Sequence, residues 1–353
     1  MAYTTIDKPS DYFNTKLYTG NGTAIGSGGL VVTGVGFQPD WVWLKNRTTG
    51  DRSHQVYDVI RGVTKGLKTN SSDEENTSSE RLAAFGSDGF TVGNNGDVNT
   101  SGNAYVSWNW LASNTTASNT DGSITSSVSA NQDAGFSIVS YTGTGANATV
   151  GHGLSSVPYM MIIKKRNSAT GSNWMVYHKS ISGTGDGHLW LDLTNGRSDD
   201  VNSWNNTAPT SSVFSIGTRS ENNGSGDTFI AYCFAPKSGF SSMGQYTGNG
   251  NADGTFVYTG FKPAWLMIKK SSATEEWYMY DNKRTPFNEI AKGLAANLSG
   301  AEFDTGATID FLSNGFKNTG TNTGTNASGA TYIYMCFAEN PFVTSTGVPA
   351  TAR

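Results

Sequence analysis

Residues able to do acid–base or metal chemistry are few in this chain and follow no known pattern. The histidines, His54, His152, His178 and His188, form no HExxH spacing, and the two cysteines form no CxxC pair. No G-x-S-x-G sequence is present to hold a nucleophilic serine. We therefore expect solvated or hydrogen-bonded loop histidines, and we predict no catalytic residue, no metal site and no cofactor.

Two acidic clusters, Asp73-Glu74-Glu75 and Asp199-Asp200, could bind a cation or act as paired acids. Ca²⁺ takes six to eight oxygen ligands, but the EF-hand loop pattern is absent. Glycoside cleavage needs two carboxyl groups held across a cleft, which a sequence does not display. We interpret both clusters as solvated loops, and we leave open whether a loop binds Ca²⁺.

The nine tryptophans raise a glycan-binding hypothesis, because an exposed aromatic face can stack on a sugar. Five of them fall in strands that we predict to be buried, so they are assigned to the core: Trp41, Trp43, Trp108, Trp110 and Trp265. Trp204 lies in a polar, loop-like stretch. It is the candidate exposed aromatic for a glycan or receptor.

The elements that must position these residues recur three times along the chain. A Tyr-Thr-Gly turn appears at Tyr18, Tyr141 and Tyr246. Each turn is followed by a proline, a short apolar run and a lysine, namely Pro39 to Lys45, Pro158 to Lys164 and Pro263 to Lys269. The period is roughly 105–120 residues, which is the size of a domain rather than of a solenoid repeat.

Within each repeat the pattern favours strands. The run after the proline is apolar at every position, which is typical of a strand buried on both faces. The last strand of the first repeat alternates, with Val106, Trp108 and Trp110 on one side. Short strands separated by Gly and Asn turns indicate two packed antiparallel sheets. The sequence therefore predicts an all-β fold of three tandem antiparallel β-sandwich domains related by internal repeat.

The same landmarks set the predicted boundaries. We expect an N-terminal arm at residues 1–11, repeats at 12–117, 131–237 and 238–343, a linker at 118–130 and a C-terminal tail at 344–353. The linker is rich in Ser, Thr and Asn. Cys233 and Cys336 occupy the same position in two repeats, so we expect two buried free thiols rather than a disulfide.

Composition excludes several kinds of partner. The formal net charge of −4 does not favour nucleic acid or an anionic membrane. The sequence contains no run of about 18 apolar residues, so we predict no membrane-spanning segment. The first residues lack the layout of a secretory signal, so we expect release by lysis, as part of an assembled particle, if the protein acts outside a cell.

Several segments of the first repeat resemble a repeated domain in structural proteins of marine tailed bacteriophages. They are residues 3–15, 36–47, 57–62, 87–93 and 108–110. The later repeats keep the Pro-to-Lys strand and the last strand. We interpret them as lacking the Asp-x-x-Arg-Gly piece that the first repeat has at residues 58–62. The resemblance implies a lectin-like or SPRY-like β-sandwich and carries no assigned chemistry.

The resemblance implies a non-enzymatic virion protein on the particle surface, either a tail fibre or another appendage that mediates host attachment. We expect the arm to contact other virion proteins, and variable loops to contact a host-surface glycan or protein. By analogy with virion appendages, we expect a homo-oligomer and take a trimer as the first hypothesis. The alternatives are a capsid decoration or head-fibre protein, and a glycan-degrading depolymerase.

Overall fold

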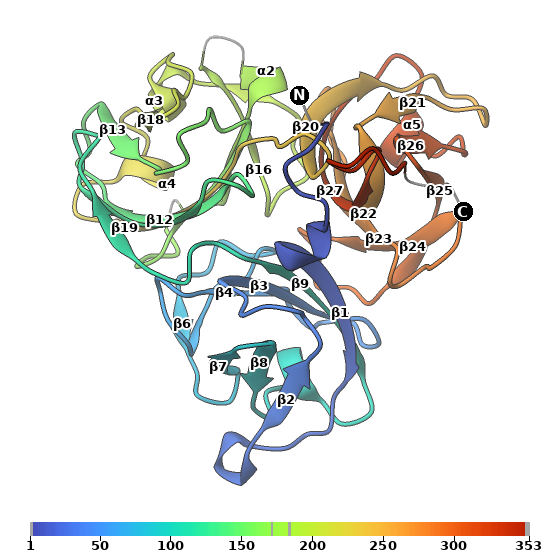
Figure 1. Ribbon diagram of the computed structural model, residues 1–353. Coiled ribbons are helices and arrows are strands. Elements are labelled where there is room, and N and C mark those ends of the chain that lie inside the picture. Colours follow the sequence, from blue (N-terminus) through green and yellow to red (C-terminus); the bar gives the residue numbers. More distant parts are fainter. Residues whose placement is uncertain (1–2, 171, 183–184, 350–353) are drawn as a thin grey trace.

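The computed structural model describes residues 3–170, 172–182 and 185–349, and the chain is all-β, with 43% of it in strands and 8% in helices. Figure 1 shows three lobes around a common centre. We name them unit 1 (β1–β9), unit 2 (β10–β19) and unit 3 (β20–β27). Each contact region between two units is called a seam.

Unit 1 contains β1 (Phe13–Thr19), β2 (Leu30–Thr33), β3 (Trp41–Asn46), β4 (Gln55–Asp58), β5 (Lys65–Gly66), β6 (Asn76–Thr77), β7 (Leu82–Gly86), β8 (Gly89–Val92) and β9 (Ala104–Trp110). Its helical turns are η2 (Ile25–Ser27) and α1 (Gly96–Asn99), and η1 (Pro9–Asp11) precedes it. The main sheet has the order β1-β9-β3-β4, and a second sheet has the order β2-β8-β7.

Unit 2 contains β10 (Ala117–Asn119), β11 (Ser126–Asn131), β12 (Phe136–Thr142), β13 (Ala148–Gly151), β14 (Met160–Lys165), β15 (Met175–His178), β16 (Gly187–Trp190), β17 (Ser198–Asp199), β18 (Val213–Ile216) and β19 (Thr228–Phe234). Its helices are α2 (Lys179–Ser182), α3 (Val201–Trp204) and α4 (Ser220–Asn223). The main sheet runs β10-β11-β12-β19-β14-β15-β16-β17, and β13 pairs with β18.

Unit 3 contains β20 (Ser241–Thr247), β21 (Phe256–Tyr258), β22 (Phe261–Lys270), β23 (Trp277–Asp281), β24 (Ile290–Ala295), β25 (Phe303–Leu312), β26 (Gly315–Asn318), β27 (Thr331–Pro341) and the helix α5 (Thr323–Asn326). Its strands form one sheet in the order β20-β27-β22-β23-β24-β25-β26-β21. This sheet is nearly closed.

The same four-stranded antiparallel core and register recur in all three units. The orders are β1-β9-β3-β4, β12-β19-β14-β15 and β20-β27-β22-β23. Equivalent cross-strand pairs are Trp41 with Trp110, Met160 with Phe234, and Trp265 with Phe337. The internal similarity of the sequence is therefore a similarity of strand pairing.

The Tyr-Thr-Gly turn has one structural role, which unit 1 illustrates. The Tyr18 hydroxyl donates to Val98 O at 2.8 Å, and Asn99 Oδ1 accepts from Asn21 N at 2.7 Å. A Cβ on Gly20 would lie 2.2 Å from Thr100 O, so a side chain there has no space. The equivalent tyrosine and asparagine contacts are Tyr141 to Asn222 O, Tyr246 to Thr325 O, Asn223 to Thr144 N and Asn326 to Asn249 N.

The strand after each proline is buried on both faces, as its composition predicts. In β3, Val42 and Leu44 face a core inside unit 1, whereas Trp41 and Trp43 face a second cluster that contains residues of all three units. Units 2 and 3 also have internal cores of their own. The five tryptophans assigned to the core are each at most 1% exposed, and both cysteines are buried and free.

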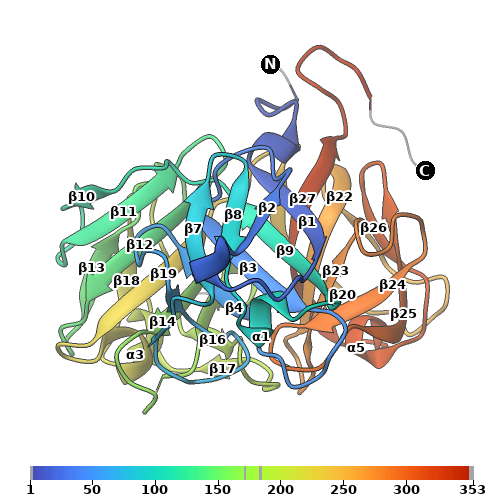
Figure 2. The same ribbon diagram turned by 90° about the horizontal axis from the view of Figure 1, so that it is seen from below.

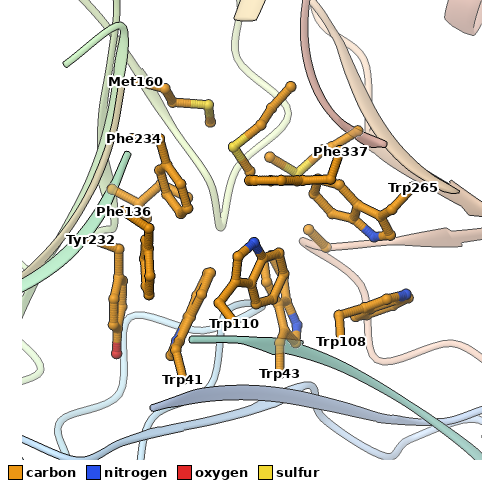
Figure 3. Packing of buried hydrophobic residues seen from close by; sticks show 14 of the residues in the cluster. Trp41, Trp43, Trp108, Trp110, Phe136, Met160, Tyr232, Phe234, Trp265 and Phe337 are labelled. Atoms are coloured by element: carbon orange, nitrogen blue, oxygen red, sulfur yellow. The ribbon is translucent and has the colours of Figure 1, made fainter. Parts of the chain in front are cut away.

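The shared cluster is rich in aromatic side chains, and Figure 3 shows several of them packed together. Ring contacts join each pair of units. Trp41 stacks on Tyr232 with centroids 4.4 Å apart, Trp110 meets Trp265 edge-on at 5.8 Å, and Phe234 meets Phe337 at 6.1 Å. The three main sheets therefore pack against one another through one hydrophobic core.

The segment 118–130 is not the unstructured linker that its composition suggested. Most of it belongs to β10 and β11, which extend the unit 2 sheet beyond β12, and Ile124 bridges to Val150. Val128 and Ile124 are buried in the unit 2 core. Spaced apolar residues in a Ser- and Thr-rich stretch are enough for an added hairpin, because the β12 edge supplies its backbone partners.

The arm and the tail lie against unit 3, apart from residues 1–2 and 350–353, which are outside the described residues. Thr4 donates to Ser238 O at 2.8 Å, and Tyr3 donates to Gly260 O at 2.7 Å. Ile6 is buried in the shared cluster. Asp7 accepts from Ser345 N at 2.6 Å, so both ends of the described chain lie together, as Figure 2 shows.

We predict that Trp41→Ala lowers the free energy of unfolding by about 3–5 kcal/mol, because it leaves a cavity where two units meet. Urea unfolding followed by far-UV circular dichroism should show one transition at lower urea, since the units share a core. The control is Phe287→Ala, whose parent side chain is 69% exposed in unit 3. Separate transitions for the units, or a loss equal to that of the control, would contradict a shared core.

Candidate binding site at the seams between units

The lysine that ends each repeated strand binds a carbonyl oxygen of a neighbouring unit. Lys45 of unit 1 donates to Ser299 O of unit 3 at 3.2 Å, Lys164 of unit 2 to Ser72 O of unit 1 at 3.2 Å, and Lys269 of unit 3 to Thr194 O of unit 2 at 2.9 Å. The three contacts run in the same sense around the centre. The units are therefore joined head to tail in a ring with pseudo-threefold symmetry.

Burial lowers the pKa of these three lysines, Lys45, Lys164 and Lys269, from 10.5 to about 8. Each ammonium also donates to the carbonyl of the next residue in its own strand. Carbonyl dipoles stabilise an ammonium less than a buried carboxylate would, so desolvation dominates. The repeated lysine is a structural clasp between units.

A buried arginine network closes the seam between units 1 and 2. Arg61 pairs with Asp58, both with fully buried side chains, and it lies 3.3 Å from Glu75. Arg166 of unit 2 binds the same Glu75 through two hydrogen bonds of 3.0 and 3.1 Å. The hydroxyl of Tyr232, also from unit 2, donates to Asp58 at 2.8 Å. Two arginines from different units thus share one carboxylate.

The seam between units 3 and 1 repeats this network. Arg284 pairs with the buried Asp281 and lies 3.3 Å from Glu302, which Arg47 of unit 1 binds at 2.8 and 3.0 Å. Trp108 of unit 1 donates to Asp281 at 3.1 Å. The expectation that unit 3 loses the Asp-x-x-Arg piece is wrong. Only the glycine is missing, and the acid and base keep their spacing.

The seam between units 2 and 3 has different side chains on the same backbone. Arg197 N donates to Ser271 O at 2.7 Å, as Glu75 N does to Arg166 O and Glu302 N to Arg47 O in the other seams. Arg197 therefore stands where the others have a glutamate, and Ser271 stands where they have an arginine. His178 and Ile181 replace the aspartate and arginine of the buried pair.

At this seam the side chains leave a polar cleft of about 350 Å³. It is lined by Ser180, Ile181, Arg197, Asp199, Gln245, Ser271, Ser272 and Thr331. Arg197 donates to Asp199 at 2.6 Å, and the two side chains are 40% and 57% exposed. Ser271, which lines the cleft, is the residue that replaces the arginine of the other two seams. We take this cleft as the candidate binding site.

Trp204 is not the exposed aromatic that its polar neighbourhood suggested. It is 1% exposed, it donates to Gly187 O at 3.1 Å, and it meets Tyr177 edge-on at 5.5 Å. The short helix α3, which Asp200 caps through Asn202 N, turns the indole inward. A glycan therefore cannot stack on Trp204.

The histidines are not solvated, although each is hydrogen-bonded. His54, His152, His178 and His188 are buried, and burial lowers the pKa of every one, that of His178 to about 4. His178 Nε2 lies 3.3 Å from Tyr334 O across the seam between units 2 and 3. Neutral imidazoles therefore serve packing, and near neutral pH these four do not add charge.

The acidic clusters divide between structure and surface. Glu75 belongs to the buried network, whereas Asp73 pairs with Lys68 at 2.7 Å on the surface. Asp199 lies at the candidate cleft, and Asp200 binds Arg219 at 2.6 Å. Within the described residues no group of three or more His, Cys, Asp or Glu side chains could hold a metal ion, and no helix is long and apolar enough to cross a membrane.

Arg197, Gln245 and Ser271, the residues that distinguish the cleft, were missed by the motif-based reading of the sequence. One signal for them was present. The second residue after the repeated lysine is an arginine in the first two repeats, Arg47 and Arg166, but it is Ser271 in the third. A departure from an internal repeat marks a position that the scaffold does not require.

We predict that Arg61→Met costs about 3–5 kcal/mol of stability, because it leaves Asp58 charged, buried and without its ion-pair partner. Equilibrium urea unfolding at neutral pH measures this loss. The control is Lys8→Met, which removes a surface pair whose side chains are 71% and 51% exposed and should change stability by about 0–1 kcal/mol. Equal effects of the two substitutions would refute the structural role of the network.

Stability should increase between about pH 7.5 and pH 9. In this interval the buried lysines lose protons in the native state, near pKa 8, while unfolded lysine keeps its proton until near 10.5. The unfolded chain then binds more protons, so the free energy of unfolding rises with pH, by about 1 kcal/mol per lysine. Above pH 9 the buried thiols of Cys233 and Cys336 oppose the trend, because burial raises their pKa from 9.0.

Urea unfolding at the two pH values tests this expectation. Lys164→Met should remove about a third of the rise, because one of three equivalent groups is lost. A flat or falling profile in the wild-type protein would show that the lysines remain charged in the native state throughout the interval.

A known protein family matches nearly the whole chain. Residues 8–341, from just before η1 to the end of β27, match a single family model. No curated protein and no solved structure matches the chain. The match is continuous through all three units. The chain belongs to the family described as "Domain of unknown function (DUF7483)".

Proposed function

We propose that the protein is a non-enzymatic structural component of a bacteriophage particle, a tail fibre or similar surface appendage that mediates attachment to the host. Under this proposal the three units are tandem β-sandwiches of lectin-like or SPRY-like type that arose by internal repetition. The segments of unit 1 that resemble phage structural proteins, together with a chain built almost wholly from strands and Gly-, Ser- and Asn-rich turns, support the assignment.

The observation that carries the proposal is the joining of three repeats into one body with both described chain ends at one end. The shared aromatic cluster and the three lysine clasps couple the units. Asp7 and Ser345 bring the arm and the C-terminal segment together, and Figure 2 places α1, α3 and α5 at the far side. An attachment protein needs such a division between a docking end and a presenting end.

We propose that the docking end, formed by the arm and the C-terminal segment, contacts other virion proteins. The presenting surface would contact a host-surface glycan or protein, with the cleft between units 2 and 3 as its binding site. A homo-oligomer, with a trimer as the first hypothesis, remains part of the proposal.

The location of the protein on the particle tests the proposal. We expect that gold-labelled antibodies against the purified protein mark the tail or its appendages in electron micrographs of intact phage. Labelling confined to the capsid lattice would replace the tail assignment with capsid decoration, and absence from purified particles would refute a virion role. Release of sugar from host polysaccharide by the purified protein, abolished by a single Asp or Glu substitution, would support a depolymerase instead.

A further inference from the structure

From the cleft between units 2 and 3 we infer a binding site for a neutral saccharide of one or two sugar units. This inference rests on the proposed attachment function and names the ligand class of that site. Three features of the cleft point to this ligand: its difference from the two equivalent seams, the charge of its wall, and the donors and acceptors on that wall.

The cleft is a specific departure from the repeat and not a general packing defect. In the other two seams the arginines at this position, Arg47 and Arg166, reach across to a glutamate and occupy the space between units. In the third seam the arginine is replaced by Ser271, while the backbone contact from Arg197 N to Ser271 O is kept. The same backbone contact therefore occurs in two seams that an arginine–glutamate pair fills and in one seam that contains a cleft.

The charge of the cleft wall favours a neutral ligand. Among the described residues that line it, Arg197 and Asp199 carry the charge, and they pair with each other at 2.6 Å. Asp186 also lies 3.6 Å from the Arg197 guanidinium. An anion entering the cleft would meet Asp199, and a cation would meet Arg197, so neither gains a field of one sign. A ligand without charge avoids both repulsions.

The polar groups of the wall match hydroxyl groups. Arg197 only donates, Asp199 only accepts, and Gln245, Ser180 and Ser272 can do both, so a ligand must donate and accept at neighbouring positions. Vicinal hydroxyls on a sugar ring do so. Ile181 also lines the cleft but is only 4% exposed, so the wall that a ligand meets is mainly polar. The volume of about 350 Å³ lies at the small end of ligand pockets, which suits one or two rings.

The test closes the cleft with the side chains of the other seams. The double variant Ser271→Arg with Arg197→Glu rebuilds the arginine–glutamate pair found at the equivalent positions of both other seams. We expect the wild-type protein to bind neutral saccharides on a printed array of neutral and acidic mono- to tetrasaccharides. The double variant should bind the same saccharides at least tenfold more weakly in titration calorimetry.

Two further variants separate loss of binding from loss of folding. Ser211→Arg adds an arginine at an exposed position of unit 2 outside the cleft and should bind like the wild type. Gln245→Leu places in unit 3 the residue that unit 1 has at the equivalent position, Leu17, so the sheet accommodates it. It should fold, with unchanged circular dichroism, and bind at least threefold more weakly.

The outcomes distinguish this inference from the attachment proposal. Undiminished saccharide binding by the double variant and by Gln245→Leu would overturn the cleft as the site. Preference of the wild type for acidic saccharides would overturn the ligand class, and binding to no saccharide on the array would overturn both. None of these results changes where the protein lies on the particle, which the labelling experiment decides separately.

Discussion

The shared aromatic cluster is the constraint on which the rest of this structure depends. Each main sheet has one face covered by its own unit and one face that only the other two units can cover. Trp41, Trp110 and Tyr232 fill that second face together with their equivalents. Each large aromatic side chain buries much apolar surface. Separating the units would expose this surface to water at a cost in free energy. The three repeats therefore behave as one body.

Once the units are held face to face, the buried charged groups at the seams need hydrogen-bond partners. Lys45, Lys164 and Lys269 use carbonyl oxygens, and the two arginine networks use a glutamate shared between units. Unsatisfied charges in such places are costly, because the low dielectric that strengthens a pair also penalises a lone ion. This explains why the buried charged residues of the seams are each held by hydrogen bonds or ion pairs.

Pseudo-symmetry also explains where a binding site can arise. Two filled seams and the aromatic cluster already hold the ring together, so the third seam is free to differ. Exchange of the arginine for Ser271 and of the glutamate for Arg197 opens a cleft without changing the backbone contact between the units. The walls of this site come from two units that the shared cluster holds together, with Ser180 and Ile181 from α2 on one side and Gln245 from β20 on the other.

The sequence by itself determined the strand content, the repeat, the burial of the five core tryptophans and the free cysteines. These follow from local spacing, because a strand with apolar residues at every position must be covered on both faces. Only the tertiary structure decided what covers the second face, that Trp204 points inward and that 118–130 adds strands to a sheet. The spacing of Asp281 and Arg284 is visible in the sequence, but their burial as an ion pair is seen only in the structure. The tertiary structure also brought Arg197, Gln245 and Ser271 to one cleft. The physical reason is that periodicity states which side chains avoid water, whereas the partner that excludes the water lies a hundred or more residues away.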